Sequence, residues 1–120
     1  MKREIRSVDD IRLMVDVFYD LAGRDKLLGP IFRNMKDSAP HREMLYQYWE
    51  NQILNESAGE DQSFPEHISL MFTTQHFIRW LGLFLETIDT LYGGAVADKA
   101  KVILIRKSEE FQMKLEILRF

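Results

Sequence analysis

The chain has 120 residues, of which 46% are hydrophobic and 29% charged, and its formal net charge is −3. A chain of this length is expected to fold as one domain over residues 1–120, with 1–6 as a short N-terminal extension. The balance of apolar and charged residues is typical of a soluble globular protein and excludes an intrinsically disordered one. Because lysine and arginine are spread along a chain of net negative charge, a nucleic-acid partner is not expected.

Cysteine is absent, which excludes disulfides, thiolate metal sites and a cysteine nucleophile. The first eighteen residues have no signal-peptide core, because acidic and basic residues interrupt their apolar positions. Arg79, Glu86 and Asp89 interrupt the most apolar region in the same way, so no membrane span is expected. The sequence therefore predicts a cytoplasmic protein without a membrane partner.

Helical periodicity predicts a first helix that begins near Ser7 and ends at Gly23. Ser7 followed by Asp10 resembles a capping box. Apolar residues then recur at helical spacing: Val8, Ile11, Met14, Val15, Phe18 and Leu21. The next segment contains Gly29-Pro30 and only short apolar pieces. It is predicted to be an irregular connector with room for a turn of helix on each side, and with Ile31 and Phe32 pointing inward.

A second helix is predicted from about Pro40 to Asn55, with His41 on its apolar face. A polar loop follows, and a short helix from Phe64 to about Met71 would turn His67 inward. A long helix is then predicted to begin at Thr73 or Thr74 and to end at the glycine pair 93–94, before a last helix over 95–118. No segment alternates as a strand would, so the fold class is all-α with about four to six helices.

The sequence lacks the motifs of a zinc protease, a di-iron bundle, a serine hydrolase and a Walker loop. Few polar side chains are predicted to face inward: Tyr19, His41, Tyr48, Trp49, His67 and Trp80. Buried polar tips need hydrogen-bond partners, and a helical core seldom collects several of them. Two interpretations stay open at this point. In the first, each of these polar atoms forms a hydrogen bond to a neighbouring carbonyl; in the second, the six side chains surround a ligand.

Four segments in order, "FYDLAGRDKLLGPIF", "YWENQIL", "FPEHISL" and "HFIRWLGLFLETID", give the chain a recognisable pattern. The sequence resembles the truncated haemoglobins, and within them the third group. The resemblance runs from about Val8 to Leu115. It implies a shortened globin-like helical fold that encloses haem b, which is iron protoporphyrin IX.

The resemblance also implies roles for five residues. His67 matches the proximal histidine, the protein ligand to the haem iron. Tyr19 matches the tyrosine of the distal side, and Trp80 matches the tryptophan that approaches the bound ligand. Phe32 matches the phenylalanine that packs on the porphyrin. His41 matches the distal histidine through its interval to Trp49.

The function implied is binding of O2 or another diatomic ligand at a histidine-ligated iron. Distal donors such as the Tyr19 hydroxyl and the Trp80 indole are equally compatible with redox chemistry on O2, nitric oxide or peroxide, which would need an external reductase. The interval from Phe32 to His41 is shorter than in the family. It motivates an alternative, a globin-fold module that has lost haem and acts through a protein partner. A plain helical bundle, whose inward polar residues are only structural, is the third hypothesis.

Overall fold

The computed structural model describes residues 2–35, 39–54 and 72–119, and within them only the backbone of 34–35, 39–41 and 114–119. This part of the chain forms five helices: α1 Val8–Arg24, α2 Gly29–Met35, α3 Ala39–Ile53, α6 Thr74–Leu91 and α7 Ala95–Arg119. The prediction of an all-α fold is therefore confirmed. The short helix expected over 64–71, with His67, lies outside the described residues.

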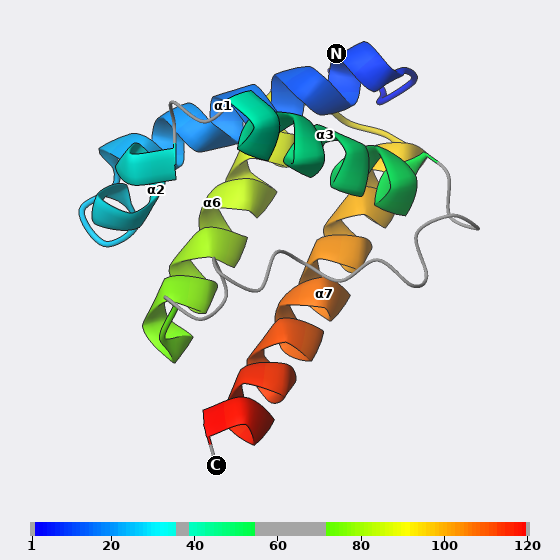
Figure 1. The fold of residues 1–120 in the computed structure, drawn as a ribbon. Helices are drawn as coiled ribbons and strands as arrows, with labels where there is room; N and C mark the ends of the chain where they lie inside the picture. The colour runs from blue at the N-terminus through cyan, green and yellow to red at the C-terminus, as the bar shows by residue number, and fades with distance from the viewer. Residues whose placement is uncertain (1, 36–38, 55–71, 120) are drawn as a thin grey trace.

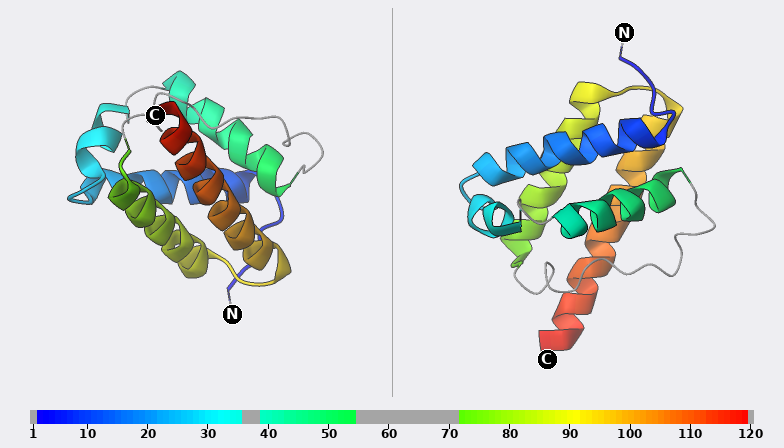
Figure 2. Two further views of the ribbon diagram at one scale, coloured as in Figure 1. Left: turned by 90° about the horizontal axis from the view of Figure 1, so that it is seen from below. Right: turned by 45° about the horizontal axis from the view of Figure 1, so that its top comes forward.

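The helices form two layers that cross (Figure 1). Helices α1 and α3 run side by side across the pair α6 and α7, and α2 lies beside the C-terminal end of α1 (Figure 2). Helix α1 packs on α6, α2 and α3, and α3 also packs on α7. The apolar faces of both layers meet in one core, which contains most of the aromatic side chains of α1, α3 and α6. The described core therefore lies between the layers.

Helix α1 begins as the capping pattern predicts. The Asp10 carboxylate accepts hydrogen bonds from the backbone N–H groups of Arg6 and Ser7, at 2.8 and 3.2 Å. These bonds satisfy N–H groups that would otherwise lack partners at the helix start. Val8 is 43% exposed and does not join the apolar face predicted for it; the buried apolar residues of α1 begin at Ile11.

The connector predicted to be irregular contains α2, a helix of seven residues. Gly29-Pro30 stands in the first turn of this helix, where proline is tolerated because its missing N–H needs no partner there. Before the helix, the Asp25 carboxylate accepts the N–H groups of Leu27 and Leu28 and pairs with Arg79 of α6 at 2.7 Å. Burial alone would raise the pKa of Asp25, but these bonds outweigh it and lower that pKa.

Helix α6 begins at the predicted threonine. Thr73 is the N-cap residue, and its hydroxyl accepts the backbone N–H of His76 at 3.4 Å. In return the His76 Nδ1 accepts the backbone N–H of Thr73 at 3.0 Å. The histidine thus takes the place that glutamate or glutamine has in a capping box. His76 is therefore a capping residue at the start of α6.

The N-terminal segment packs on the turn between α6 and α7. Arg3 forms a parallel bridge with Tyr92, and its carbonyl accepts the N–H of Gly93 at 3.0 Å. The Glu4 carboxylate accepts the N–H of Val96 at 2.6 Å, in the first turn of α7. Ile5 is buried beside them. The residues expected to be an N-terminal extension therefore cap a helix and contribute to the core.

We expect Gly94→Ala to lower the free energy of unfolding, whereas Gly82→Ala should raise it. Gly94 has a φ of 100°, and a Cβ there would lie 2.7 Å from the Glu4 carboxylate. Gly82 lies within α6, and no atom of the described residues lies within 4 Å of its Cβ position, so alanine adds helix propensity without a clash. The expected changes are a loss of about 1–3 kcal/mol and a gain of about 0.5–1 kcal/mol. Chemical denaturation of both variants measures them, and equal stability of the two would contradict the expectation.

Among the described helices, none is both long and apolar enough to cross a membrane.

Candidate ligand-binding site between the helices

A small cavity lies between the two helix layers. Its volume is about 10 Å³, close to the space that one water molecule needs. Side chains from α1, α2, α3 and α6 line it: Val15, Phe18, Tyr19, Phe32, Leu45, Trp49, Trp80 and Phe84. All eight are buried. The cavity therefore has an aromatic and aliphatic wall, and the polar atoms that its lining residues carry on their side chains are the Tyr19 hydroxyl and two indole N–H groups.

The aromatic rings around the cavity fix one another. Phe18 stacks on Phe84 with their centroids 4.3 Å apart. The rings of Phe32 and Tyr19 pack edge-on with their centroids 5.4 Å apart, and the centroids of Trp80 and Trp49 are 6.2 Å apart. Edge-on and offset pairs of this kind are favourable beyond the area they bury. The wall is thus preorganised by contacts between four helices.

The Tyr19 hydroxyl is the unusual group in this wall. Tyr19 is 3% exposed, and within the part of the chain that the structure describes its Oη has no hydrogen-bond partner. Burial raises the pKa of this phenol above its ordinary value of 10.0, against the lowering influence of the nearby Arg42 charge. The phenol is therefore neutral at physiological pH and carries a proton that it can donate. A buried donor without an acceptor is costly, which makes this position a candidate for ligand binding.

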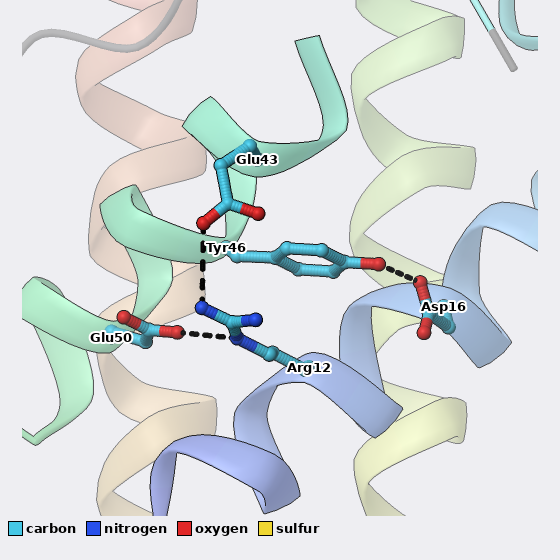
Figure 3. A network of polar contacts seen from close by, with 5 residues as sticks. All are labelled: Arg12, Asp16, Glu43, Tyr46 and Glu50. Atoms are coloured by element: carbon cyan, nitrogen blue, oxygen red, sulfur yellow. Dashed lines mark hydrogen bonds and ion pairs between the residues drawn. The ribbon is translucent and has the colours of Figure 1, made fainter. Parts of the chain in front are cut away.

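Polar contacts join α1 to α3 next to the cavity. Figure 3 shows Arg12 of α1 reaching Glu43 and Glu50 of α3, at 3.3 and 3.2 Å, while the Tyr46 hydroxyl donates to the Asp16 carboxylate. Burial of Tyr46 and its bond to Asp16 raise the pKa of the Tyr46 phenol. These contacts fix α3 on α1 at the solvent side of the layer.

Two comparisons with known proteins agree with this architecture. No protein-family model matches the chain. The group 3 truncated hemoglobin ctb of Campylobacter jejuni is 26% identical over 115 residues, which cover 91% of this chain and 87% of that protein. The crystal structure of a group III truncated hemoglobin from Campylobacter jejuni matches with a TM-score of 0.68 and 28% identity, over 96% of this chain and 95% of that one.

The chain is a homologue of the group III truncated haemoglobins. The family and the fold predicted from the sequence are thus confirmed, including the assignment to the third group. Truncated haemoglobins typically bind haem. The two relatives match the chain over nearly its whole length, so the likeness includes all five described helices and is not confined to one motif.

The structure brings three of the five predicted site residues of this truncated haemoglobin homologue together. Tyr19, Phe32 and Trp80 line the same cavity, from α1, α2 and α6. His41 belongs to the first turn of α3, and its side chain lies outside the described part of the chain. His67 lies outside it as well. The roles of all five residues remain predictions.

Two residues near this site were not singled out in the sequence. Phe72 is fully buried, and its ring centroid lies 6.0 Å from that of Phe32. The His76 ring stacks on Phe72 with their centroids 5.6 Å apart. Arg42 lies over the Tyr19 ring. No local pattern of α3 marks Arg42, because its contacts are with Asp16 and Tyr19 of α1.

The described residues contain no group of three or more histidine, aspartate or glutamate side chains arranged to hold a metal ion. A metal centre built from the described side chains alone is therefore not supported.

Proposed function

We propose that the chain binds haem b, with His67 as the protein ligand to the iron, and that it takes O2 or another diatomic ligand on the side of Tyr19 and Trp80. The proposal treats residues 1–120 as one domain. Its main support is the buried Tyr19 hydroxyl, which has no partner among the described residues and belongs to a cavity with apolar walls. A ligand that accepts a hydrogen bond there would remove the cost of the unsatisfied donor.

The side chains at the cavity fit haem in their chemistry. A porphyrin is flat and largely apolar, and aromatic rings such as Phe32, Trp49 and Phe84 are suitable neighbours for it. The chemistry of these lining residues is therefore compatible with the proposed cofactor.

Bound haem supplies an iron that takes diatomic ligands and exchanges electrons. The chain itself contributes donors and exclusion of water. The neutral Tyr19 phenol would donate to a ligand that carries partial negative charge, and the Trp80 indole offers a second N–H on an apolar body. His41 is proposed to act on the same, distal side as Tyr19 and Trp80. Redox turnover of O2, nitric oxide or peroxide would need an external reductase.

The proposal is tested by the optical spectrum of the purified chain in its ferric, dithionite-reduced and carbon monoxide-bound forms, before and after one equivalent of haemin. We expect a Soret band that saturates at one haem per chain and shifts on reduction and carbon monoxide binding. A chain that folds, by circular dichroism, yet gives no Soret band even with added haemin would overturn the proposal.

One alternative is a globin-fold module that has lost haem and acts through a protein partner. It is motivated by the interval from Phe32 to His41, which is shorter than the family resemblance leads us to expect. If this alternative holds, added haemin should leave the thermal unfolding midpoint unchanged. A haem-binding chain should instead become more stable as haemin is added, because a ligand of the native state shifts the folding equilibrium.

A further inference from the structure

Arg42 lies between solvent and the Tyr19 ring. Its guanidinium carbon is 5.3 Å from the centroid of that ring, within the range of a cation–π contact. The same guanidinium pairs with the Asp16 carboxylate at 3.4 Å, and its side chain is 28% exposed. The Arg42 side chain therefore reaches from α3 over the Tyr19 ring, and Asp16 of α1 pairs with its guanidinium.

A second contact strengthens this anchor. The Asp16 oxygen that pairs with Arg42 also accepts the hydroxyl of Tyr46, four residues later on α3. One carboxylate of α1 thus holds two side chains of α3. Because Asp16 and Tyr19 are three residues apart on α1, they lie on neighbouring positions of one helix face. This arrangement fixes the guanidinium relative to the tyrosine.

The charge of Arg42 reaches the phenol itself. Its positive potential opposes the effect of burial on the pKa of Tyr19, because it favours negative charge at the phenol oxygen. The same potential polarises the O–H bond and makes the hydroxyl a stronger donor.

We propose that Arg42, anchored by Asp16, is a positioning and specificity-determining residue: it orients and polarises the Tyr19 hydroxyl, so that the cavity prefers ligands that carry negative charge. The proposal rests on the proposed function for the identity of the site. The contact between Arg42 and Tyr19 does not depend on haem. The proposed function and the proposed role of Arg42 can therefore be disproved separately.

The contact is tested first by NMR of the purified full chain labelled with 13C at the tyrosine ζ carbon, in the carbonmonoxy form if the chain carries haem. We expect Arg42→Met to shift the Tyr19 resonance, which Tyr19→Phe identifies, while Arg42→Lys keeps it near its original position. Arg106→Met is the matched control, because it removes the same charge from an exposed position on α7. Equal shifts of the Tyr19 resonance in Arg42→Met and Arg106→Met would overturn the proposal.

The preference for charge is tested in the haem-loaded chain with azide, an anion, for the ferric form and carbon monoxide, a neutral ligand, for the ferrous form. We expect Arg42→Met to weaken azide binding about two- to fivefold and to leave carbon monoxide affinity unchanged. The azide effect should disappear in a Tyr19→Phe background, since Arg42 acts through that hydroxyl. Equal losses for both ligands would overturn the proposal. If the wild-type chain binds no haem, the proposed function fails and the NMR result alone decides the role of Arg42.

Discussion

His67→Ala is expected to abolish stoichiometric haem uptake, and His76→Ala to leave it intact. His67 is the residue that the family resemblance matches to the proximal ligand, and neutral imidazole is a common protein ligand of haem iron. In His76 the Nδ1 atom already accepts the Thr73 N–H, and the ring stacks on Phe72. That histidine is therefore committed to the start of α6. A haemin titration followed at the Soret band measures the stoichiometry for each variant.

The two variants separate a loss of ligand from a loss of fold. His76→Ala removes a cap and should lower the free energy of unfolding by about 0.5–2 kcal/mol, with haem still bound at one per chain. His67→Ala is expected to keep the helical circular dichroism of the wild type while it loses the titration endpoint. The opposite pattern, with haem lost only in His76→Ala, would move the iron ligand to α6 and contradict the assignment.

The parts of the fold that could be predicted are those that depend on local signals. Thr73 has the side chain that an N-cap requires, and the structure begins α6 directly after it. The apolar residues of α1 and α6 repeat every three or four positions, and Phe18, Phe77 and Phe84 are all buried as that period requires. Such signals lie within one turn of helix, so a single sequence contains them in full.

What could not be predicted depends on contacts between distant segments. Helix α2 is only seven residues long, and the bonds that support its start come from Asp25, which Arg79 of α6 holds in place. Isolated helices of that length are unstable, so its local sequence gives little indication of it. In the same way Arg42 reads as an exposed helix residue until α1 supplies Asp16 and Tyr19.

The same distinction between local signals and contacts of distant segments applies to the candidate site. Tyr19, Phe32 and Trp80 were named by family resemblance, and packing of three helices brings them to one cavity. That the Tyr19 hydroxyl is buried without a partner among the described residues follows from this packing and not from any local pattern. The resemblance gave the residue, while the structure gives the physical reason to test it.

Tyr19→Phe should have opposite effects on the stability of the chain and on ligand binding. Without a ligand, the substitution removes a buried hydroxyl that has no partner within the described residues, so the free energy of unfolding should rise by about 1 kcal/mol. With haem and O2 bound, it removes a donor to a ligand with partial negative charge. Release of O2 should then become about ten- to hundredfold faster, as expected for loss of a charge-assisted hydrogen bond. Trp80→Phe should accelerate release in the same direction.

Tyr92→Phe is the matched control for this reasoning. Its hydroxyl is also buried, but it donates to the Asp10 carbonyl at 2.7 Å, and neither residue lines the cavity. Losing that bond should lower the free energy of unfolding by about 1 kcal/mol and leave O2 release unchanged. Denaturation of the haem-free chains and stopped-flow displacement of O2 measure the two effects. If Tyr19→Phe destabilised the haem-free chain as Tyr92→Phe does, the Tyr19 hydroxyl would have a partner in the folded protein. The cost that a ligand relieves would then be absent, and the distal role of Tyr19 would lose its physical basis.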